Sequence, residues 1–379
     1  MKNAKILIVD DNDVNRILLQ HTFEDEEYEI FESESGYEAL EIVKNKAIDI
    51  ILLDVMMPGM DGYETCQRIK TNPQSHDIPI IFITALNDKE SKLKGLNLGG
   101  VDFISKPFDM FEVKLRIKQH LKIRQLYLSL RKQSLKTSKD LLIARQVQMG
   151  LLPQNNVSFN EDIFFSYEYL PCDSLGGDFL DYIKIDEEHY FFYLADISGH
   201  GVPSALVTMF VKQFFESYLS NSNEIAPHIA IGKLNEAMLN LNFHDRYLTL
   251  FTGLLNIQTK ELRWASAGPN TPPLLIKEDS IDVLDNRSLA VGWLPDIVWE
   301  EKKLTLPRNS SLLLYSDAAT EVKNDFDEQL GVDGFKKLID KSEFGEYQEF
   351  VELVNELLDY SDDIGFDDDL TFVSLRVRK

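Results

Sequence analysis

Residues 50–62 read Ile-Ile-Leu-Leu-Asp-Val-Met-Met-Pro-Gly-Met-Asp-Gly, and this stretch decides the fold of the first part of the chain. The predicted strand Asp49–Leu53 is followed at once by a carboxylate, Asp54, and then by the turn residues Pro58 and Gly59. A short apolar run bounded by turn residues is typical of a strand buried on both faces of a sheet. The stretch therefore predicts a strand of a parallel sheet with a carboxylate at its carboxyl end.

Similar apolar runs lie on both sides of this stretch and alternate with helical spacing across residues 1–120. The other predicted strands are Lys5–Val9, Ile30–Phe31, Ile78–Thr84 and Val101–Ser105, with helical spacing in Asn15–Phe23, Tyr37–Lys46 and Tyr63–Lys70. Strands that are each followed by a helix predict an α/β fold, a doubly wound five-stranded parallel sheet. In such folds the ligand crevice lies beyond the carboxyl ends of the strands, where the strand order reverses.

Polar residues fall at those strand ends. Asp10 and Asp11 follow the first strand, Asp54 the third, Thr84 ends the fourth, and Lys106 follows the fifth. Three converging carboxylates repel one another, and a hard divalent cation such as Mg²⁺, which prefers oxygen ligands, explains their convergence. Asp54 is then expected to attack a phosphoryl donor as a nucleophile, while Lys106 and Thr84 contact the oxygens of the acyl phosphate.

These motifs resemble the receiver domain of bacterial response regulators. The matching text is Val9-Asp10-Asp11-Asn12, Leu53-Asp54-Val55-Met56-Met57-Pro58-Gly59-Met60-Asp61-Gly62, Thr84-Ala85 and Ser105-Lys106-Pro107-Phe108. The resemblance implies that a sensor histidine kinase phosphorylates Asp54. It also implies that Mg²⁺ is held by Asp11, Asp54 and the Met56 carbonyl with Asp10 assisting, and that Phe103 is the aromatic switch residue.

Composition excludes several classes of protein. The 379 residues predict two domains, and the net charge of −24 argues against a broad nucleic-acid surface because phosphate backbones repel it. No stretch approaches the roughly 18 apolar residues that span a bilayer, and no signal peptide is recognised, so we expect a soluble cytoplasmic protein without a membrane partner. The two cysteines, Cys66 and Cys172, make neither a disulfide framework nor a zinc site.

A basic segment separates two acidic regions. Leu121–Gly150 contains seven Lys/Arg and one Asp, a net of +6, so the remaining residues carry −24 − 6 = −30. Its apolar residues repeat every seven positions at Leu121, Leu128, Leu135, Leu142 and Met149, which predicts one long helix over Phe111–Leu152 that ends near Pro153. Two interpretations stay open, an amphipathic helix packed on a neighbouring domain and a marginal coiled coil that forms a homodimer and shifts with phosphorylation. The domains predicted are 1–120, a helical linker 121–153, and 154–379.

The last 226 residues differ in sequence pattern from the first 120, because they contain many predicted strands and few predicted helices. The predicted strands are Phe164–Leu170, Tyr190–Ala195, Thr249–Asn256, Leu262–Ser266, Leu312–Tyr315 and Leu370–Arg376, and the predicted helices are Pro203–Tyr218, Pro227–Asn240 and Gln348–Tyr360. This pattern predicts an α+β domain, a β-sandwich of antiparallel sheets flanked by helices.

Aspartates again recur at strand ends, beside glycines and other small residues. They are Asp178 after Gly176-Gly177, Asp196 before Ile197-Ser198-Gly199-His200-Gly201, Asp317 after Ser316, and Asp368 within Asp367-Asp368-Asp369. Carboxylates from four distant segments without a His/Cys set favour two hard cations, Mn²⁺ or Mg²⁺, over zinc. Two such ions would activate a water molecule and bind the phosphate oxygens. The sequence shows no Ser-His-Asp triad and no cysteine-based phosphatase loop, so a covalent route is disfavoured.

These residues resemble the metal-dependent protein phosphatase superfamily, in its bacterial branch of stage II sporulation and stress-response phosphatases. The motifs are Leu151-Leu152-Pro153, Gly176-Gly177-Asp178-Phe179, Ala195-Asp196-Ile197-Ser198-Gly199-His200-Gly201, Ala267-Gly268, Ser316-Asp317 with Thr320-Glu321, and Asp368-Asp369-Leu370-Thr371. The resemblance implies that Asp178, Asp196 and the Ile197 carbonyl hold one metal, and that Asp196, Asp317 and Asp368 hold the other. It implies as substrate a phosphoserine or phosphothreonine on an anti-anti-sigma-type protein, with His200 as an acid or a loop-stabilising residue.

Two departures from the family pattern keep alternatives open. Ala318 stands where the family usually has Gly after the third aspartate, and Pro269 follows Ala267-Gly268 where it usually has His. The first hypothesis is an enzyme controlled by Asp54 phosphorylation. Because of these departures, the alternative is a pseudophosphatase that only sequesters a signalling partner. The motif Gly176-Gly177-Asp178-Phe179 also suggests a nucleotide cyclase. However, the Glu that a cyclase should have after Asp178 is missing, and this activity would not explain Asp196, Asp317 and Asp368.

Overall fold

The computed structural model describes most of the chain, in two compact units that are treated separately below, residues 1–137 and 138–379. The described residues are 3–85, 89–199, 201–222, 224–241, 243, 246–268, 271–284, 288–339, 347–361 and 365–378. Within these ranges, no helix combines the length and the hydropathy that a membrane span requires.

The first unit is built on a five-stranded parallel sheet in the order β2-β1-β3-β4-β5, as predicted. Its strands are β1 (Ala4–Val9), β2 (Tyr28–Ser33), β3 (Ile50–Asp54), β4 (Ile80–Thr84) and β5 (Asp102–Ser105). Because β2 and β3 lie on opposite sides of β1, the strand order reverses there and a crevice opens beyond the carboxyl ends of β1 and β3.

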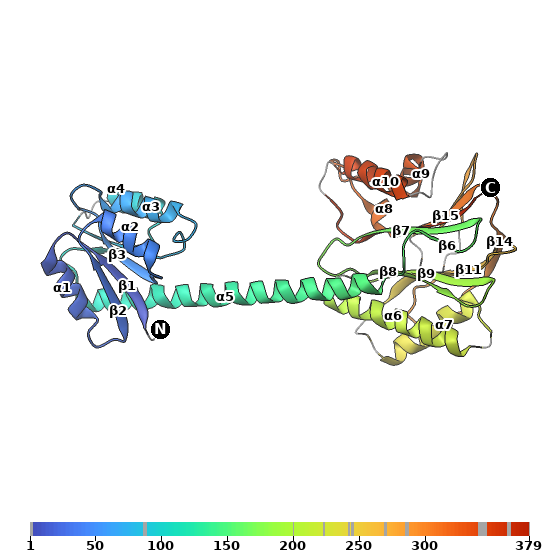
Figure 1. Cartoon of the computed structure of the whole chain (residues 1–379), viewed down its shortest axis with the longest axis horizontal. Helices are drawn as coiled ribbons and strands as arrows, with labels where there is room; N and C mark the ends of the chain where they lie inside the picture. The colour runs from blue at the N-terminus through green and yellow to red at the C-terminus, as the bar shows by residue number, and fades with distance from the viewer. Residues whose placement is uncertain are drawn as a thin grey trace. The chain divides into compact units, whose positions relative to one another are not determined.

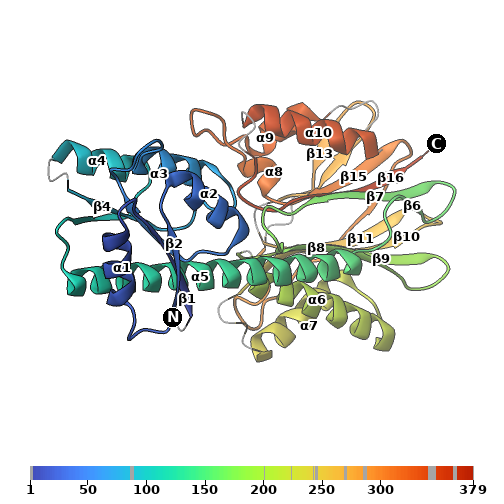
Figure 2. The same cartoon turned by 60° about the vertical axis from the view of Figure 1, so that its left-hand side comes forward.

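Helices cover both faces of this sheet (Figures 1 and 2). They are α1 (Asp13–Thr22), α2 (Gly36–Asn45), α3 (Gly62–Thr71), α4 (Lys89–Asn97) and the start of α5 (Met110–Leu151). Alternate residues of a strand face opposite sides, so Leu7 and Leu53 pack in one core with α2 and α3, whereas Ile6 and Leu52 pack in another with α1 and α5. Side-chain caps at Asn12, Ser35 and Asp61 begin three of the helices.

The long predicted helix is α5, a single helix of 42 residues. Its first turns belong to the core of the first unit, where Val113, Ile117 and Leu121 are fully buried. Beyond Leu121 the members of the seven-residue repeat are exposed, by 37% at Leu128, 66% at Leu135, 59% at Leu142 and 40% at Met149. The last turns, from Ser138, belong to the second unit.

The second unit contains two antiparallel sheets, as predicted. One has the order β14-β11-β10-β9-β8 and the other β13-β12-β15-β16-β7-β6. The strands are β6 (Val157–Ser158), β7 (Ile163–Leu170), β8 (Asp178–Lys184), β9 (His189–Ile197), β10 (Leu248–Asn256), β11 (Glu261–Ala267), β12 (Leu274–Ile276), β13 (Ile281–Val283), β14 (Lys302–Thr305), β15 (Ser310–Tyr315) and β16 (Leu370–Val377).

The two sheets face each other between two layers of helices (Figures 1 and 2). Helices α6 (Val202–Asn221) and α7 (Pro227–Leu241) cover the first sheet, and α8 (Ala318–Glu321), α9 (Gly331–Leu338) and α10 (Tyr347–Tyr360) cover the second. Large side chains such as Phe192, Phe251, Trp264 and Leu314 fill the space between the sheets. The predicted sandwich flanked by helices is therefore confirmed.

Several elements of this unit were not predicted. The sequence Asp178-Phe179-Leu180-Asp181-Tyr182-Ile183-Lys184 forms β8 although two of its aspartates are buried. Buried carboxylates are rare, so these two aspartates obscure the apolar pattern by which a strand is recognised. Strands β12 and β13 and helix α8 have three or four residues each, which is too short for periodicity to show.

Candidate metal centres

The first candidate site lies in the crevice beyond β1 and β3. Asp10 follows β1 and Asp54 ends β3, and both side chains are buried, whereas Asp11 is exposed. One carboxylate oxygen from each of Asp10, Asp11 and Asp54 lies within 4.8 Å of the others. The sheet therefore brings together three carboxylates that are far apart in the sequence.

A lysine sits between two of these carboxylates. Lys106 Nζ lies 2.9 Å from Asp10 Oδ2 and 2.9 Å from Asp54 Oδ2. Burial lowers the pKa of Lys106, but its hydrogen bonds to the two aspartates outweigh burial and hold that pKa above its ordinary value. Burial raises the pKa of Asp54 although Lys106 opposes the shift. Lys106 thus supplies a positive charge at this site, but burial still disfavours the ionised form of Asp54.

One oxygen of Asp54 has no hydrogen-bond partner in the part of the chain that the structure describes. Oδ1 is buried and accepts no hydrogen bond from the described residues, whereas both oxygens of Asp10 accept from Asn15 Nδ2. An unpartnered buried carboxylate oxygen beside Asp11 is what a Mg²⁺ ion or an incoming phosphoryl group would meet. The residues present therefore fit the implied ion. The Met56 N–H also hydrogen-bonds to Asp54, and this places Met56 beside the site.

The remaining predicted residues of this site lie on β4 and β5. Thr84 is buried at the end of β4, and its carbonyl accepts from Lys106 N at 2.8 Å. Phe103 is half-buried on β5, where Lys92 Nζ lies 4.3 Å from the centre of its ring. These contacts place Thr84 next to the lysine backbone and Phe103 next to α4.

The second candidate site begins with two aspartates on neighbouring strands. Asp178 at the start of β8 is paired directly with Asp196 near the end of β9. Because Leu180 and Leu194 face the space between the sheets, Asp178 and Asp196, an even number of residues away, face the same side. Like charges directly opposite each other destabilise a strand pair, so this register calls for a compensating charge.

The opposite sheet supplies two more aspartates at the same end of the sandwich. Asp317 follows β15 and Asp368 precedes β16, and these strands are neighbours in the second sheet. Two hydrogen bonds join their ends, Ser316 N to Thr371 O at 3.0 Å and Thr371 N to Ser316 Oγ at 2.8 Å. The hydroxyl of Thr371, which faces the first sheet, donates to Asp178 Oδ2.

The pKa values record how strongly these carboxylates repel one another. Burial, then Asp196 and other aspartates, raises the pKa of Asp178 well above its usual range. Burial, with Asp317 and Asp368 next, raises the pKa of Asp196 to about 8, and burial with Asp368 raises that of Asp317 to about 6. No lysine or arginine of the described residues forms an ion pair with Asp178, Asp196 or Asp317.

The backbone beside these aspartates brings two carbonyl oxygens close to Gly177. A Cβ on Gly177 would lie 2.7 Å from the Ile197 carbonyl oxygen and 3.0 Å from that of Gly199, so only glycine fits this cradle of oxygens. Oxygen donors alone, with carboxylates whose charge is not neutralised, suit hard divalent cations. The residues present therefore fit the implied metals. The four carboxylates are nevertheless spread more widely than those of the receiver site, because among the described residues no three of them gather within 4.8 Å.

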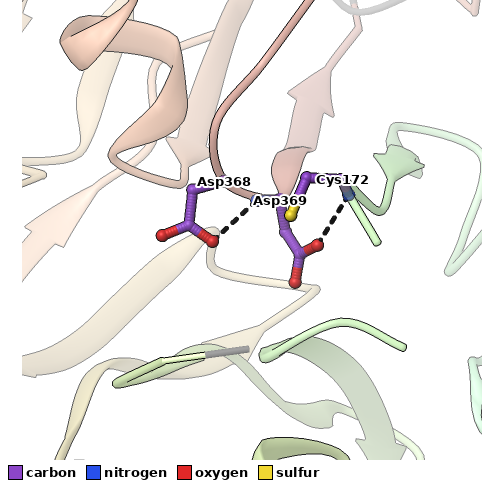
Figure 3. Close-up of side chains that lie close together, drawn as sticks. All are labelled: Cys172, Asp368 and Asp369. Atoms are coloured by element: carbon purple, nitrogen blue, oxygen red, sulfur yellow. Dashed lines mark hydrogen bonds between the residues drawn. The ribbon is translucent and has the colours of Figure 1, made fainter. Parts of the chain in front are cut away.

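Sequence reasoning missed the role of Asp369, the neighbour of Asp368. Asp369 is buried, and its carboxylate accepts hydrogen bonds from the backbone N–H groups of Cys172, Gly177 and Asp178. Figure 3 shows the bond from Cys172 and the separate bond from Asp369 N to Asp368 Oδ1. Asp369 thus connects the segment before β8 to the start of β16. The sequence could not show this role, because nothing in two adjacent aspartates indicates which one hydrogen-bonds to the backbone.

Cys172 lies within 4.8 Å of Asp368 and Asp369, as measured between possible ligand atoms. Burial, then the negative charge of Asp369 and Asp368, raises the pKa of the Cys172 thiol to about 12. The nucleophile and metal ligand of cysteine is the thiolate, so a thiol with this pKa is suited to neither task at neutral pH.

Three residues singled out from the sequence remain, His200, Pro269 and Ala318. His200 and Pro269 lie outside the described ranges. Ala318 is buried as the first residue of α8 and keeps an ordinary negative φ, so its methyl group imposes no strain on the backbone that follows Asp317.

The family models match both units. The model "Response regulator receiver domain" matches residues 6–118, and the model "Stage II sporulation protein E (SpoIIE)" matches residues 186–378, more than half of the chain. The second match begins after Asp178, so that residue lies outside it.

Individual proteins resemble one unit or the other. Sporulation initiation phosphotransferase F of Bacillus subtilis is 38% identical over 124 residues, 33% of this chain and 98% of that protein. Response regulator PleD of Caulobacter vibrioides is 40% identical over 116 residues, 31% of this chain but only 26% of PleD, so the chain spans about a quarter of that relative.

The second unit has a counterpart among solved structures. The SiaA-PP2C domain of Pseudomonas aeruginosa superposes with a TM-score of 0.57 at 20% identity, covering 64% of this chain and 98% of that domain, which shows a shared fold. The chain therefore belongs to the stage II sporulation protein E (SpoIIE) family, and it joins a domain of that family to a response regulator receiver domain.

Proposed function

We propose that this chain is a response regulator whose output is metal-dependent hydrolysis of a phosphoserine or phosphothreonine. The observation that supports the proposal is that Asp178 and Asp196 of one sheet and Asp317 and Asp368 of the other lie at the same end of the sandwich, where burial and the neighbouring negative charges raise the pKa values of Asp178, Asp196 and Asp317. A cluster that is unfavourable without cations and built only from oxygen donors is suited to divalent metals.

The residues divide between two ion positions. Asp178, Asp196 and the Ile197 carbonyl would hold one divalent ion, Mn²⁺ or Mg²⁺, and Asp196, Asp317 and Asp368 would hold the second. When bound, such a pair of ions supplies an activated water and neutralises the charge on the phosphate oxygens. The chain fixes the ligands, because Thr371 orients Asp178 and Asp369 holds its backbone N–H.

The input is proposed to be phosphorylation of Asp54 by a sensor histidine kinase with Mg²⁺ at Asp11, Asp54 and the Met56 carbonyl. Asp54 Oδ1, which has no described partner, is free to attack the phosphorus atom, and the P–N bond of the phosphohistidine breaks as the new O–P bond forms. Lys106 neutralises the product from its position 2.9 Å from Oδ2. A cation bound beside Asp54 would lower the pKa that burial raises, and so would favour the carboxylate form that acts as the nucleophile.

The substrate is proposed to be a small phosphorylated regulatory protein of the anti-anti-sigma type. Membership in the SpoIIE family supports this choice, and the exposure of Asp368 lets a phosphorylated side chain of another protein approach the pocket.

Helix α5 is proposed to carry the signal. It contributes Val113 and Ile117 to the receiver core and continues without a break to Leu151, so phosphorylation that shifts the receiver face near Phe103 has a continuous element to act on. The exposed repeat at Leu128, Leu135 and Leu142 supports a second role, a homodimer through this helix.

The alternative is a pseudophosphatase that binds and sequesters its partner. Its sequence support was Ala318, but this residue has helical backbone angles that alanine adopts freely. The geometry thus gives no conformational reason for an inactive site, and the enzyme is preferred.

The test is release of inorganic phosphate from an aryl phosphate and from candidate phosphoproteins by the full chain. We expect turnover that needs Mn²⁺ or Mg²⁺, is lost in Asp196→Asn, and changes when an acyl-phosphate mimic such as beryllium fluoride occupies the receiver. Absence of metal-dependent turnover on every substrate, with the partner still bound, would favour sequestration instead.

A further inference from the structure

Two aromatic side chains are stacked on each other at the surface of the second unit. The ring centres of Tyr247 and Trp293 lie 5.5 Å apart, and the two ring planes are inclined by only 14°. Tyr247 is 41% exposed, Trp293 is 58% exposed, and the next residue, Leu294, is 50% exposed. We call these three residues the aromatic rim. Exposed apolar side chains that lie side by side are typical of a surface that binds another molecule.

The segment that carries Trp293 is fixed to the helix beneath it. Asn235, a buried residue of α7, hydrogen-bonds to the residues on both sides of Trp293. Its Oδ1 accepts from Gly292 N at 2.7 Å, and its Nδ2 donates to the Leu294 carbonyl at 2.9 Å. An aromatic side chain that is already held in place loses little conformational entropy when a partner binds to it.

The aromatic rim lies beside the proposed metal site. Thr249 of β10 is paired with Asp196 of β9. The register continues beyond this pair, because Ser198 N donates to the Tyr247 carbonyl at 2.9 Å. Residues two apart in a strand face the same side and lie about 7 Å apart, so Tyr247 is one such step from Thr249 on the face that carries Asp196. A protein that presents a side chain to Asp196 therefore has its surface next to the aromatic rim.

The second sheet surrounds the same site with negative charge. A groove of about 590 Å³ begins at Asp368, with Lys323 as the one cation among its described lining residues and with four further carboxylates, those of Glu321, Asp325, Asp327 and Asp367. Beside the aromatic rim lies Arg246 instead, and its guanidinium donates to the neutral Ser198 carbonyl. A phosphate group carries about two negative charges, so this acidic groove repels a phosphorylated protein whereas the side of Arg246 attracts it.

We propose that the aromatic rim is the docking surface for the phosphorylated partner protein and that Trp293 is its anchor. This inference rests on the proposed function for the identity of the partner. Tyr, Trp and Arg are enriched at the centres of protein interfaces, where an aromatic ring fills a pocket of the partner and loses its water. A small phosphate ester makes no such contact, so the aromatic rim distinguishes a protein substrate from an ester that the metal site hydrolyses equally well.

The test compares two substrates of the full chain at saturating Mn²⁺. One is p-nitrophenyl phosphate, and the other is a phosphorylated anti-anti-sigma-type protein. For Trp293→Ala we expect the ratio of kcat/KM on the protein to kcat/KM on the ester to fall about 30-fold, the usual effect of removing an aromatic anchor from an interface. The change should lie in KM for the protein, because binding is weakened while the reacting groups stay in place.

A matched control lies beside the acidic groove. Phe326 is an exposed aromatic residue between the groove residues Asp325 and Asp327, and Phe326→Ala should leave the ratio within about twofold. An unchanged ratio in Trp293→Ala would overturn the inference, and so would an equal fall in Phe326→Ala.

Two further outcomes would also overturn the inference. Equal loss of both activities in Trp293→Ala would assign this residue to the fold. Dissociation of a dimer in Trp293→Ala, measured by sedimentation with the ratio unchanged, would make a second copy of the chain the occupant of the aromatic rim. Absence of Mn²⁺-dependent turnover of the phosphorylated protein by wild type would instead reject the proposed function.

Discussion

The two carboxylate sites of this chain solve the same electrostatic problem in different ways. In the receiver, Lys106 contacts Asp10 and Asp54 at 2.9 Å each, so a side chain supplies part of the compensating charge. In the second unit, Asp178, Asp196 and Asp317 have no such partner among the described residues, and burial together with the neighbouring aspartates raises the pKa of Asp196 to about 8. If the proposed ions bind, the first site therefore has a compensating charge without them, whereas the second site has none among the described residues.

The sharpest way to break this comparison is to remove one carboxylate from each site. Asp196→Asn takes away the residue shared by both proposed ions, and we expect phosphate release to fall about 1,000-fold. Asp10→Asn in the receiver should leave the basal rate on an aryl phosphate within about twofold. Steady-state assays at saturating Mn²⁺ measure both, with Asp279→Asn, an exposed residue of the second unit, as the control. A rate for Asp196→Asn near that of wild type would show that the pocket is not the catalytic site.

The second prediction concerns pH and metal together. In the metal-free fold the pKa of Asp196 is raised to about 8, so the folded state binds this proton more tightly than the unfolded chain, where the pKa is about 3.9. The stabilisation that Asp196 contributes is therefore greatest below about pH 4 and is lost as the pH rises through 8. Mn²⁺ replaces the proton, so its stabilising effect should grow with pH and reach about 2.7 kcal/mol at a hundredfold excess over Kd.

Thermal unfolding with and without EDTA between pH 5 and pH 8.5 measures this effect. The difference between the two curves should widen with pH for the second unit. A difference that stays constant or narrows would mean that the aspartates do not titrate as a metal-binding cluster.

The third prediction removes the cation from the receiver. Lys106→Met leaves Asp10 and Asp54 buried without their positively charged partner, and breaking a buried ion pair typically costs about 3–5 kcal/mol. Lys106 is partly exposed, so we expect a smaller loss of about 2 kcal/mol from the free energy of unfolding. Hydrogen exchange of peptides from β1 and β3 measures it, with the exposed Lys44→Met on α2 as the control. Equal exchange in the two variants would show that the lysine does not stabilise this site.

The smallest expected effect is at Thr371. Thr371→Val removes the hydroxyl that donates to Asp178, which loosens that ligand and weakens Mn²⁺ binding about tenfold. Thr371→Ser keeps the hydroxyl and should bind Mn²⁺ as wild type does. The ratio of the two midpoints in a Mn²⁺ titration of phosphatase rate gives the result, and a ratio near one would assign Thr371 to packing alone.

The sequence predicted the architecture because periodicity and turn residues report local structure directly. The run before Asp54 and the alternation around it were enough to predict the parallel sheet, and four aspartates beside small residues marked the second site. Pairing is a different matter, since the register that sets Asp178 opposite Asp196 depends on contacts between strands. Gln148, whose amide hydrogen-bonds to the Gly176 backbone, was not singled out from the sequence, because nothing in a helical pattern distinguishes a solvated amide from one that binds a distant backbone.

The pairing of β8 with β9 also limits how the gene for this protein can change. The two strands are joined by a tight hairpin after Lys184, at the opposite end of the pair from Asp178 and Asp196. A register slip by a single residue turns every side chain of a strand to its other face. An insertion or deletion of one residue in that distant hairpin, if it shifts the register, would turn Asp178 toward α6 and take it out of the proposed metal site without changing any residue of that site. The length of this turn is therefore expected to vary less among related proteins than its exposure suggests.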